Sequence, residues 1–385
     1  KANLKAALTS LCANNLVEYT DGTSNVSTYF CTSSPVGTAY ATATAVKFTG
    51  TAYSEVRLNV NGGSFTAACL LANWPAGTKC PTADLYWDPA AAAMAAAPAG
   101  SVVLGGLMDV EPNGFLADVR TGISAPASNI SAGFAQTFGV AVSPALYNAM
   151  FADQQAAGKL PASCLVSDTA KAECVPVIGK PQMAAIMSAN TFNAAYANGA
   201  NFLAPSLAAG TPLTYARRVD TSGTQAAAQQ YFLGNVCNGN AVGVVPEGGS
   251  AGAITVTALA TTGNVRTLLN NTSNYVIGVI SAENNQSGQA WRWVRVGGTA
   301  VAESAAPNES GVSFTNTASA KDGTYDFWFV SRVVKPNVAA VTTFWTAVTK
   351  ALNTNITAAA SKGLFAMSET KFSKGTSSSC TPVAQ

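Results

Sequence analysis

Apolar and polar residues follow two different periods along this chain, and the two periods predict both helices and strands. An apolar stripe at helical spacing opens the sequence: Ala2, Leu4, Ala7, Leu8 and Leu11. Segments with period-two alternation or short apolar runs predict strands at 43–48, 54–60, 136–142, 212–216, 253–259, 274–281, 291–296 and 325–330. Further helices are expected at 144–157, 225–233, 262–270 and 338–352. The chain is therefore expected to carry helices and strands along most of its length.

The junction between the expected strand at 212–216 and the helix at 225–233 is the clearest candidate for chemistry. Between them stand Ser222, Gly223 and Thr224. Either hydroxyl can cap the start of the helix, and the glycine lets a ligand approach the backbone closely. The first amides of such a helix have no intrahelical acceptor and lie at the positive end of its macrodipole. The junction is therefore a candidate anion site.

Charged residues precede this junction. Arg218 can offer an anion a planar fork of donors, and Asp220 can hold that fork in place. The alternative is an ordinary capped helix beside a surface arginine, because motifs this short recur by chance.

Composition narrows the classes of function. The 385 residues include 10% charged residues, carry a net charge of +2 and contain no histidine. This charge gives no case for a nucleic-acid partner. Without histidine the chain lacks the usual general base and the commonest metal ligand, which argues against a Ser-His-Asp hydrolase and a His-ligated zinc site. We expect no enzyme activity, no metal and no cofactor.

The eight cysteines favour an oxidising compartment. None forms a Cys-x-x-Cys pair, so zinc ribbons and thioredoxin-like sites are not expected. Disulfides in a periplasmic, extracellular or cell-surface protein fit the even number, and reduced, buried cysteines in a cytosolic protein are the alternative. Eight cysteines allow roughly 100 connectivities, so the sequence alone does not select one. We expect Cys12 to pair with Cys31, Cys69 with Cys80 and Cys164 with Cys174, each pair tying an insertion to a nearby element, and Cys237 then to pair with Cys380 and tie down the tail.

Neither a membrane span nor a leader is expected in this sequence. No apolar run approaches the length that a bilayer requires. No signal peptide is present either, so we expect a mature form whose leader has been removed.

The stretch from Arg218 to Thr224 resembles the signature Arg-x-Asp-x-Ser-Gly-Thr of the phosphate-binding proteins of ABC importers, a branch of the type II periplasmic binding proteins. The resemblance implies that Arg218, Ser222, Gly223 and Thr224 hold an oxyanion and that Asp220 steadies the arginine. It also implies a two-lobed α/β fold. Each lobe would be a sheet flanked by helices, and the ligand would lie between the lobes.

Two further segments resemble parts of the same family. The segment Asn61-Gly62-Gly63-Ser64 resembles its Gly-Ser segment, so Ser64 is a candidate to meet the anion, and a tight turn is the alternative. The segment 102–112 resembles Gly-x-Ser-Asp-x-Pro, in which an aspartate accepts a hydrogen bond from a protonated oxyanion. Asp109 matches that aspartate, whereas Met108 stands where the family usually has serine.

The resemblance also divides the chain. Lobe one is expected to be discontinuous, from 1–135 and 275–352, lobe two to cover 136–274, and 353–385 to form a polar tail. The family begins with a strand, whereas this sequence starts in the first helix. We expect the gap to be filled by sequence trimmed from the start, by the chain's own tail or by a segment of a neighbour.

We therefore expect a secreted solute-binding protein for a small oxyanion such as phosphate, with an ABC transporter as partner. The alternative is a structural or adhesive surface protein, or filament subunit, that reuses the fold and self-associates into a polymer. In that case subunits would exchange the tail at 364–385, with Phe365, Met367 and Phe372 as apolar anchors. A hydrolase is a weaker third hypothesis, because no nucleophile elbow is recognisable.

Overall fold

The computed structural model describes most of the chain. The described residues are 2–22, 26–60, 63–72, 79–80, 85–123, 128–169, 171–188, 199–237, 243–284, 288–299, 302–303, 317–358, 363–374 and 380. Asn61 and Gly62, part of the segment expected to meet the anion, lie outside them, as does most of the tail after residue 374.

A large mixed sheet forms the centre of the described fold. Eleven strands join it, and its main path runs in the order β10-β11-β9-β12-β7-β13-β14. These strands are β10 (Ser250–Ala251), β11 (Ile254–Leu259), β9 (Leu213–Arg218), β12 (Val276–Ser281), β7 (Ser128–Val142), β13 (Arg292–Thr299) and β14 (Ala302–Glu303). Beside this path, β15 (Trp328–Lys335) pairs with β7 and with β6 (Gly106–Met108), β16 (Leu364–Ala366) pairs with β7, and β8 (Val177–Gly179) pairs with β13.

Two smaller sheets lie towards the N-terminus of the chain. One has the order β1-β2-β3, formed by β1 (Asn15–Thr20), β2 (Val26–Thr32) and β3 (Glu55–Asn59). The other is the hairpin of β4 (Leu85–Asp88) and β5 (Ala93–Ala96).

Helices pack on the faces of these sheets. They are α1 (Ala2–Leu11), α2 (Thr66–Leu71), α3 (Pro144–Ala156), α4 (Lys180–Met187), α6 (Gly223–Leu233), α7 (Thr262–Leu269), α8 (Ala318–Asp322) and α9 (Ala339–Ala358). Five 3-10 turns are also described: η1 (Tyr40–Thr42), η2 (Pro112–Gly114), η3 (Ala172–Cys174), η4 (Ala200–Phe202) and η5 (Met367–Glu369). Mixed sheets with helices on their faces confirm the expected α/β class, and the two-lobed division stays a prediction.

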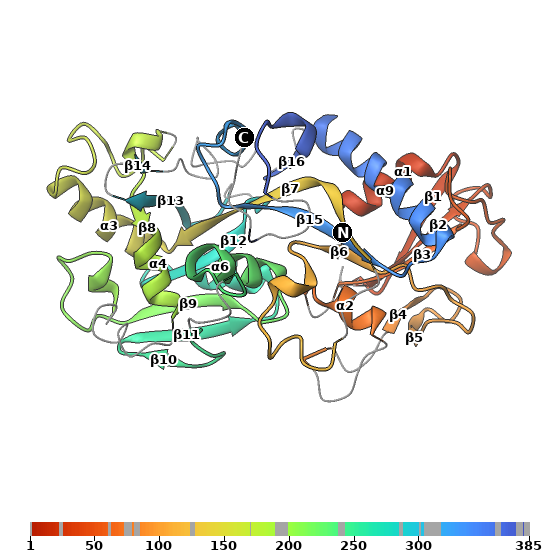
Figure 1. Ribbon diagram of the computed structural model, residues 1–385, viewed down its shortest axis with the longest axis horizontal. Helices are drawn as coiled ribbons and strands as arrows, with labels where there is room; N and C mark the ends of the chain where they lie inside the picture. The colour runs from red at the N-terminus through yellow and green to blue at the C-terminus, as the bar shows by residue number, and fades with distance from the viewer. Residues whose placement is uncertain are drawn as a thin grey trace.

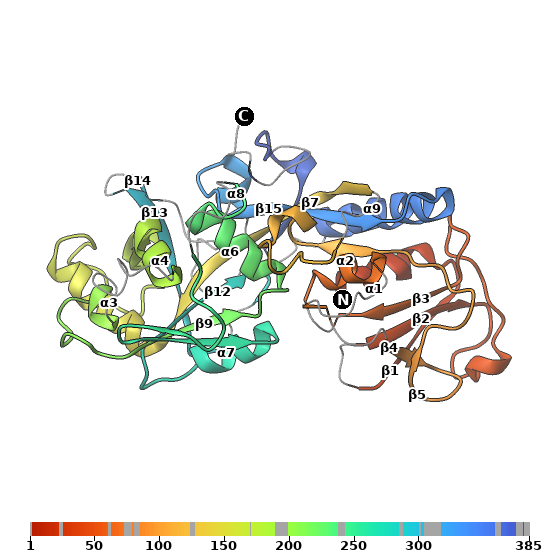
Figure 2. The ribbon, with the colours of Figure 1, turned by 60° about the horizontal axis from the view of Figure 1, so that its bottom comes forward.

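The longest strand, β7, connects the two ends of the molecule. Its first part pairs with β15, and its last residues lie between β12 and β13. Figures 1 and 2 show α3, α4 and β8–β13 near one end, and α1, α9 and β1–β5 near the other, with β7 and β15 running between them. Helices α1 and α9 pack on each other and share an apolar cluster with side chains of β2, β3 and β7.

Most expected elements are present, with shifted ends. The expected strands at 54–60 and 253–259 are β3 and β11, and the expected helices at 144–157 and 262–270 are α3 and α7. The expected strand at 43–48 is wrong. That segment makes a single bridge, from Ala45 to Thr32, and buries Phe48, because it follows the end of β2 for only a few residues before it turns.

The four disulfides have the expected connectivity. Cys12 bonds to Cys31, Cys69 to Cys80, Cys164 to Cys174 and Cys237 to Cys380. No free cysteine remains.

The C-terminal region is more structured than the expected polar tail. Helix α9 continues to Ala358, and β16 then pairs with β7. Phe365 is fully buried, and Met367 and Phe372 pack around the same small cluster. The three anchors proposed for exchange between subunits pack inside this chain, and the exchange of the tail at 364–385 stays a prediction.

None of the described helices combines the length and apolar character that a membrane crossing requires.

Candidate functional site

The site lies where β9 ends and α6 begins. Strand β9 lies between β11 and β12 and is parallel to both, so their carboxyl ends meet at one edge of the sheet. Ligands commonly bind at such an edge. Helix α6 starts at Gly223, and ten of its eleven residues are buried. The expected strand–turn–helix junction is present.

The N-terminus of α6 is not capped by a side chain. Ser222 is the N-cap residue and has an extended backbone, but its hydroxyl makes no capping hydrogen bond. The first amides of the helix, including those of Gly223 and Thr224, have no intrahelical acceptor. These donors lie at the positive end of a buried helix, which suits an anion.

The Gly63–Ser64 turn packs directly against this helix start. Gly63 has a φ of +84°, and a Cβ added there would lie 2.6 Å from the Thr221 carbonyl oxygen and 2.9 Å from Ser222 Cα. Beside it, the amide of Phe65 donates to the same Thr221 carbonyl at 3.1 Å. Only glycine combines this backbone conformation with so close an approach.

Gly223 brings Ser64 and Asp109 together. A Cβ added to Gly223 would lie 2.7 Å from Asp109 Cβ, and closer still to Asp109 Oδ2 and Ser64 Oγ. Asp109 directly follows β6. Three residues from distant parts of the sequence, Ser64, Asp109 and Gly223, thus meet at one point.

The Ser64 hydroxyl has no hydrogen-bond partner among the described residues, although its oxygen is buried. A buried hydroxyl without a partner costs about 1–3 kcal/mol, so proteins rarely retain one without a reason. An oxyanion at the start of α6 would supply the missing partner.

Asp109 has an unusual electrostatic environment. Burial raises the pKa of its carboxyl group to about 6, the Glu283 carboxylate adds to the rise, and Arg218 opposes it. Glu283 lies just beyond the end of β12, at the same edge of the sheet. Asp109 can therefore exchange a proton near neutral pH.

Arg218 is held beside the site by the start of α7. Its Nη1 donates to Thr262 Oγ1 at 2.7 Å and its Nη2 to the Ala260 carbonyl at 2.8 Å, and its Nε donates to the Leu259 carbonyl at 3.3 Å. Burial lowers the pKa of Arg218 and Asp109 opposes this, but a guanidinium stays charged. With five N–H groups in all, the side chain keeps about two for a ligand.

Asp220 does not hold Arg218, and this expectation is wrong. Its carboxylate pairs with the neighbouring arginine, Arg217, and with Lys79 at 3.0 Å. Burial raises the pKa of Asp220, but Arg217 and Lys79 outweigh burial and lower it. Consecutive strand residues point to opposite faces, so Arg217 and Arg218 cannot share one carboxylate easily.

The remaining predicted residues have clear positions. Ser222 and Thr224 are buried in the first turn of α6. Met108 is buried in the main apolar cluster, so its thioether is a core side chain.

Sequence reasoning missed three residues that shape the site: Arg217, Thr262 and Glu283. Thr262 and Glu283 follow the two strands that are parallel to β9, and the shared edge of parallel strands was the signal that could have found them. Nothing in the sequence distinguishes the role of Arg217 from that of Arg218. Within the described part of the chain, no group of three or more cysteine, aspartate or glutamate side chains is arranged to hold a metal ion.

Comparisons with known proteins add little to this geometry. No family model matches the chain, and no curated protein matches it. Among solved structures, it is similar to a putative phosphate ABC transporter substrate-binding protein with bound phosphate from Clostridium perfringens. The identity is 12% and the TM-score 0.37, and the match covers 68% of this chain and 78% of that chain.

Proposed function

We propose that this protein binds a small oxyanion at the N-terminus of α6. The observation that carries the proposal is the buried, unpartnered hydroxyl of Ser64 beside the first residue of that helix. The uncapped helix amides add donors at the same helix start, and Arg218 adds a positive charge that acts on Asp109. An anion placed there would satisfy groups that are otherwise unsatisfied.

The carboxylates favour an oxyanion that can share a proton. Asp109 faces the same point as Ser64, and burial, together with the Glu283 carboxylate, raises its pKa. A fully deprotonated anion would meet repulsion from Asp109, whereas a protonated oxyanion can donate a hydrogen bond to it. Phosphate keeps a proton near neutral pH and sulfate does not, so we propose phosphate as the preferred ligand.

We further propose that the protein binds this anion outside the cytoplasm without transforming it. Four disulfides favour a periplasmic or extracellular location. A solute-binding protein that delivers the anion to an ABC transporter fits both the site and the location.

Isothermal titration calorimetry with phosphate and sulfate tests the proposal. Arg218→Ala should weaken phosphate binding by roughly 2–5 kcal/mol, because a buried charge-assisted contact is lost. Lys350→Ala is the matched control: it removes an exposed cation on α9 and should leave binding unchanged. Phosphate affinity that survives Arg218→Ala, or that falls equally in both variants, would contradict the assignment.

A further inference from the structure

A buried lysine ends the described stretch 363–374, which we call the C-terminal segment. This segment starts at Gly363, forms β16 and η5, and ends at Lys374. The side chain of Lys374 is only 8% exposed. Lysine is rarely buried to this extent unless an opposite charge pairs with it, so the surroundings of its amino group decide which protonation state the fold prefers.

Aromatic rings and a backbone carbonyl surround the amino group of Lys374. Its Nζ donates to the Asp326 carbonyl oxygen at 2.7 Å. The same atom lies 4.3 Å from the ring centre of Phe329, 5.1 Å from that of Trp328 and 5.9 Å from that of Tyr231. Within the described part of the chain, the carbonyl is its one hydrogen-bond acceptor, whereas an ammonium has three N–H donors. The position therefore satisfies a neutral amine better than an ammonium.

The charged groups around Lys374 do not neutralise an ammonium there. The Asp326 carboxylate already accepts hydrogen bonds from Lys180, at 2.8 Å, and from the Tyr231 hydroxyl. Burial raises the pKa of that hydroxyl, so it stays neutral. Glu369, in the C-terminal segment itself, pairs with a lysine of α8 at 2.8 Å. Lys180 adds a second positive charge to the same cluster.

The balance of these effects favours the uncharged amine. Burial lowers the pKa of Lys374 to about 7, the Asp326 carboxylate opposes this fall, and Lys180 adds to it. The ring faces attract an ammonium by about 0.5–2 kcal/mol, which is less than the several kcal/mol that burial of an ion costs. The chain has no histidine and no free cysteine, so few other groups titrate between pH 7 and 9.

Lys374 lies between two other attachments of the C-terminal segment. On one side, β16 pairs with β7. On the other, Cys380 is bonded to Cys237. Tyr231 lies in the last turn of α6 and Cys237 follows that helix, so the lysine and the disulfide attach to the same part of the fold. If the lysine leaves its position, the disulfide still keeps the chain close to α6.

We propose that Lys374 controls the attachment of the C-terminal segment through its protonation state: the neutral amine holds the segment in place, and protonation loosens it. In the opened segment the lysine meets water, where its pKa is about 10.4. The closed state therefore binds the proton less tightly than the open state does. Opening becomes easier as pH falls from about 10 to 7, and it changes no further at lower pH.

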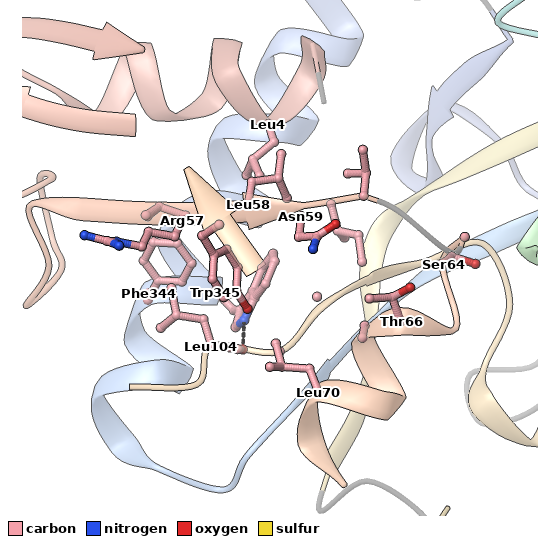
Figure 3. Close-up of a pocket in the computed structure, with 18 residues that line it drawn as sticks. Leu4, Arg57, Leu58, Asn59, Ser64, Thr66, Leu70, Leu104, Phe344 and Trp345 are labelled. Atoms are coloured by element: carbon pink, nitrogen blue, oxygen red, sulfur yellow. Dashed lines mark hydrogen bonds between the residues drawn. The ribbon is translucent and has the colours of Figure 1, made fainter. Parts of the chain in front are cut away.

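This control does not depend on the anion site. Ser64 borders an apolar cavity of about 320 Å³, and Figure 3 shows it beside Thr66, at a distance from Leu104 and Trp345 on another wall. None of the described residues that surround the Lys374 amino group lines that cavity. The proposal can therefore be tested without phosphate.

Hydrogen exchange across pH tests the proposal on the intact protein. After correction for intrinsic exchange rates, the opening constants of the β16 amides should rise about tenfold as pH falls from 9 to 8, and they should level off below pH 7. The amides of β11, at another part of the large sheet, should not follow this course. Opening constants of β16 that ignore pH would overturn the proposal. So would equal pH dependence in β11, because the whole fold would then be opening.

Two methionine variants show whether Lys374 is the group responsible. Lys374→Met keeps a long apolar side chain that cannot take up a proton, so the opening constants of β16 should be equal at pH 9 and pH 7. Lys371→Met is the matched control: it removes an exposed cation of the same segment and should keep the pH dependence of the parent protein. Circular dichroism checks that each variant is folded. The proposal is overturned if Lys374→Met retains the pH dependence, or if Lys371→Met loses it.

Discussion

Replacing Ser64 with alanine should have opposite effects on stability and on binding. The hydroxyl is buried without a partner, which costs the unliganded protein about 1–3 kcal/mol. Ser64→Ala removes that cost, so the free energy of unfolding should stay level or rise by about 1 kcal/mol. Binding should move the other way. A hydrogen bond to a charged group contributes about 1.5–3 kcal/mol, so phosphate affinity should fall about 10- to 150-fold.

Urea denaturation without phosphate and calorimetry with phosphate measure the two effects separately. Ser33→Ala, at an exposed serine of another segment, is the control and should change neither quantity. Unchanged phosphate affinity in Ser64→Ala would show that the hydroxyl does not contact the anion. A loss of stability of 1 kcal/mol or more would show that the hydroxyl is satisfied in the free protein, and the argument for the site would lose its main support.

Three further substitutions separate the roles of neighbouring residues. Gly223→Ala should abolish phosphate binding in calorimetry, because the new Cβ would occupy the point where Ser64 and Asp109 meet. If the variant keeps its phosphate affinity, the anion does not bind at that point. The pKa of Asp109 is raised to about 6, so the folded state binds the carboxyl proton more tightly than the unfolded state does. The stability that this proton contributes is therefore lost as pH rises from about 4 through 6. The free energy of unfolding of Asp109→Asn should therefore equal that of the parent protein near pH 3.5 and exceed it at pH 8, by at most about 3 kcal/mol. Equal urea midpoints for the two proteins at both pH values would argue against the raised pKa. Asp220→Asn should lower stability by about 3–5 kcal/mol, because it leaves a buried arginine unpaired, and should barely change phosphate affinity. A large affinity loss in that variant would restore the sequence-based role of Asp220 at the ligand.

The sequence by itself determined the features that depend on neighbouring residues. Period-two alternation followed by helix formers predicted the junction of β9 and α6, and Pro144 marked the start of α3. Three of the disulfides join cysteines 10 to 19 positions apart, so pairing close neighbours was sufficient. With those assigned, Cys237 and Cys380 remained for each other. Gly223 could be proposed because a glycine at the start of a helix lets a ligand approach the backbone, whereas Ser64 was proposed from the resemblance of its segment to a family motif.

Only the tertiary structure decided which side chains meet. Arg217 and Arg218 are equivalent in composition, and the strand's alternation sends one to Asp220 and the other to Thr262. The tail looked free because it is polar, yet β16 completes a pairing with β7 that lies more than 200 positions earlier. Asp109 reaches Gly223 through the pairing of β6 with β15. Local patterns cannot encode such encounters, because they depend on which distant strands pair and on the burial that this pairing produces.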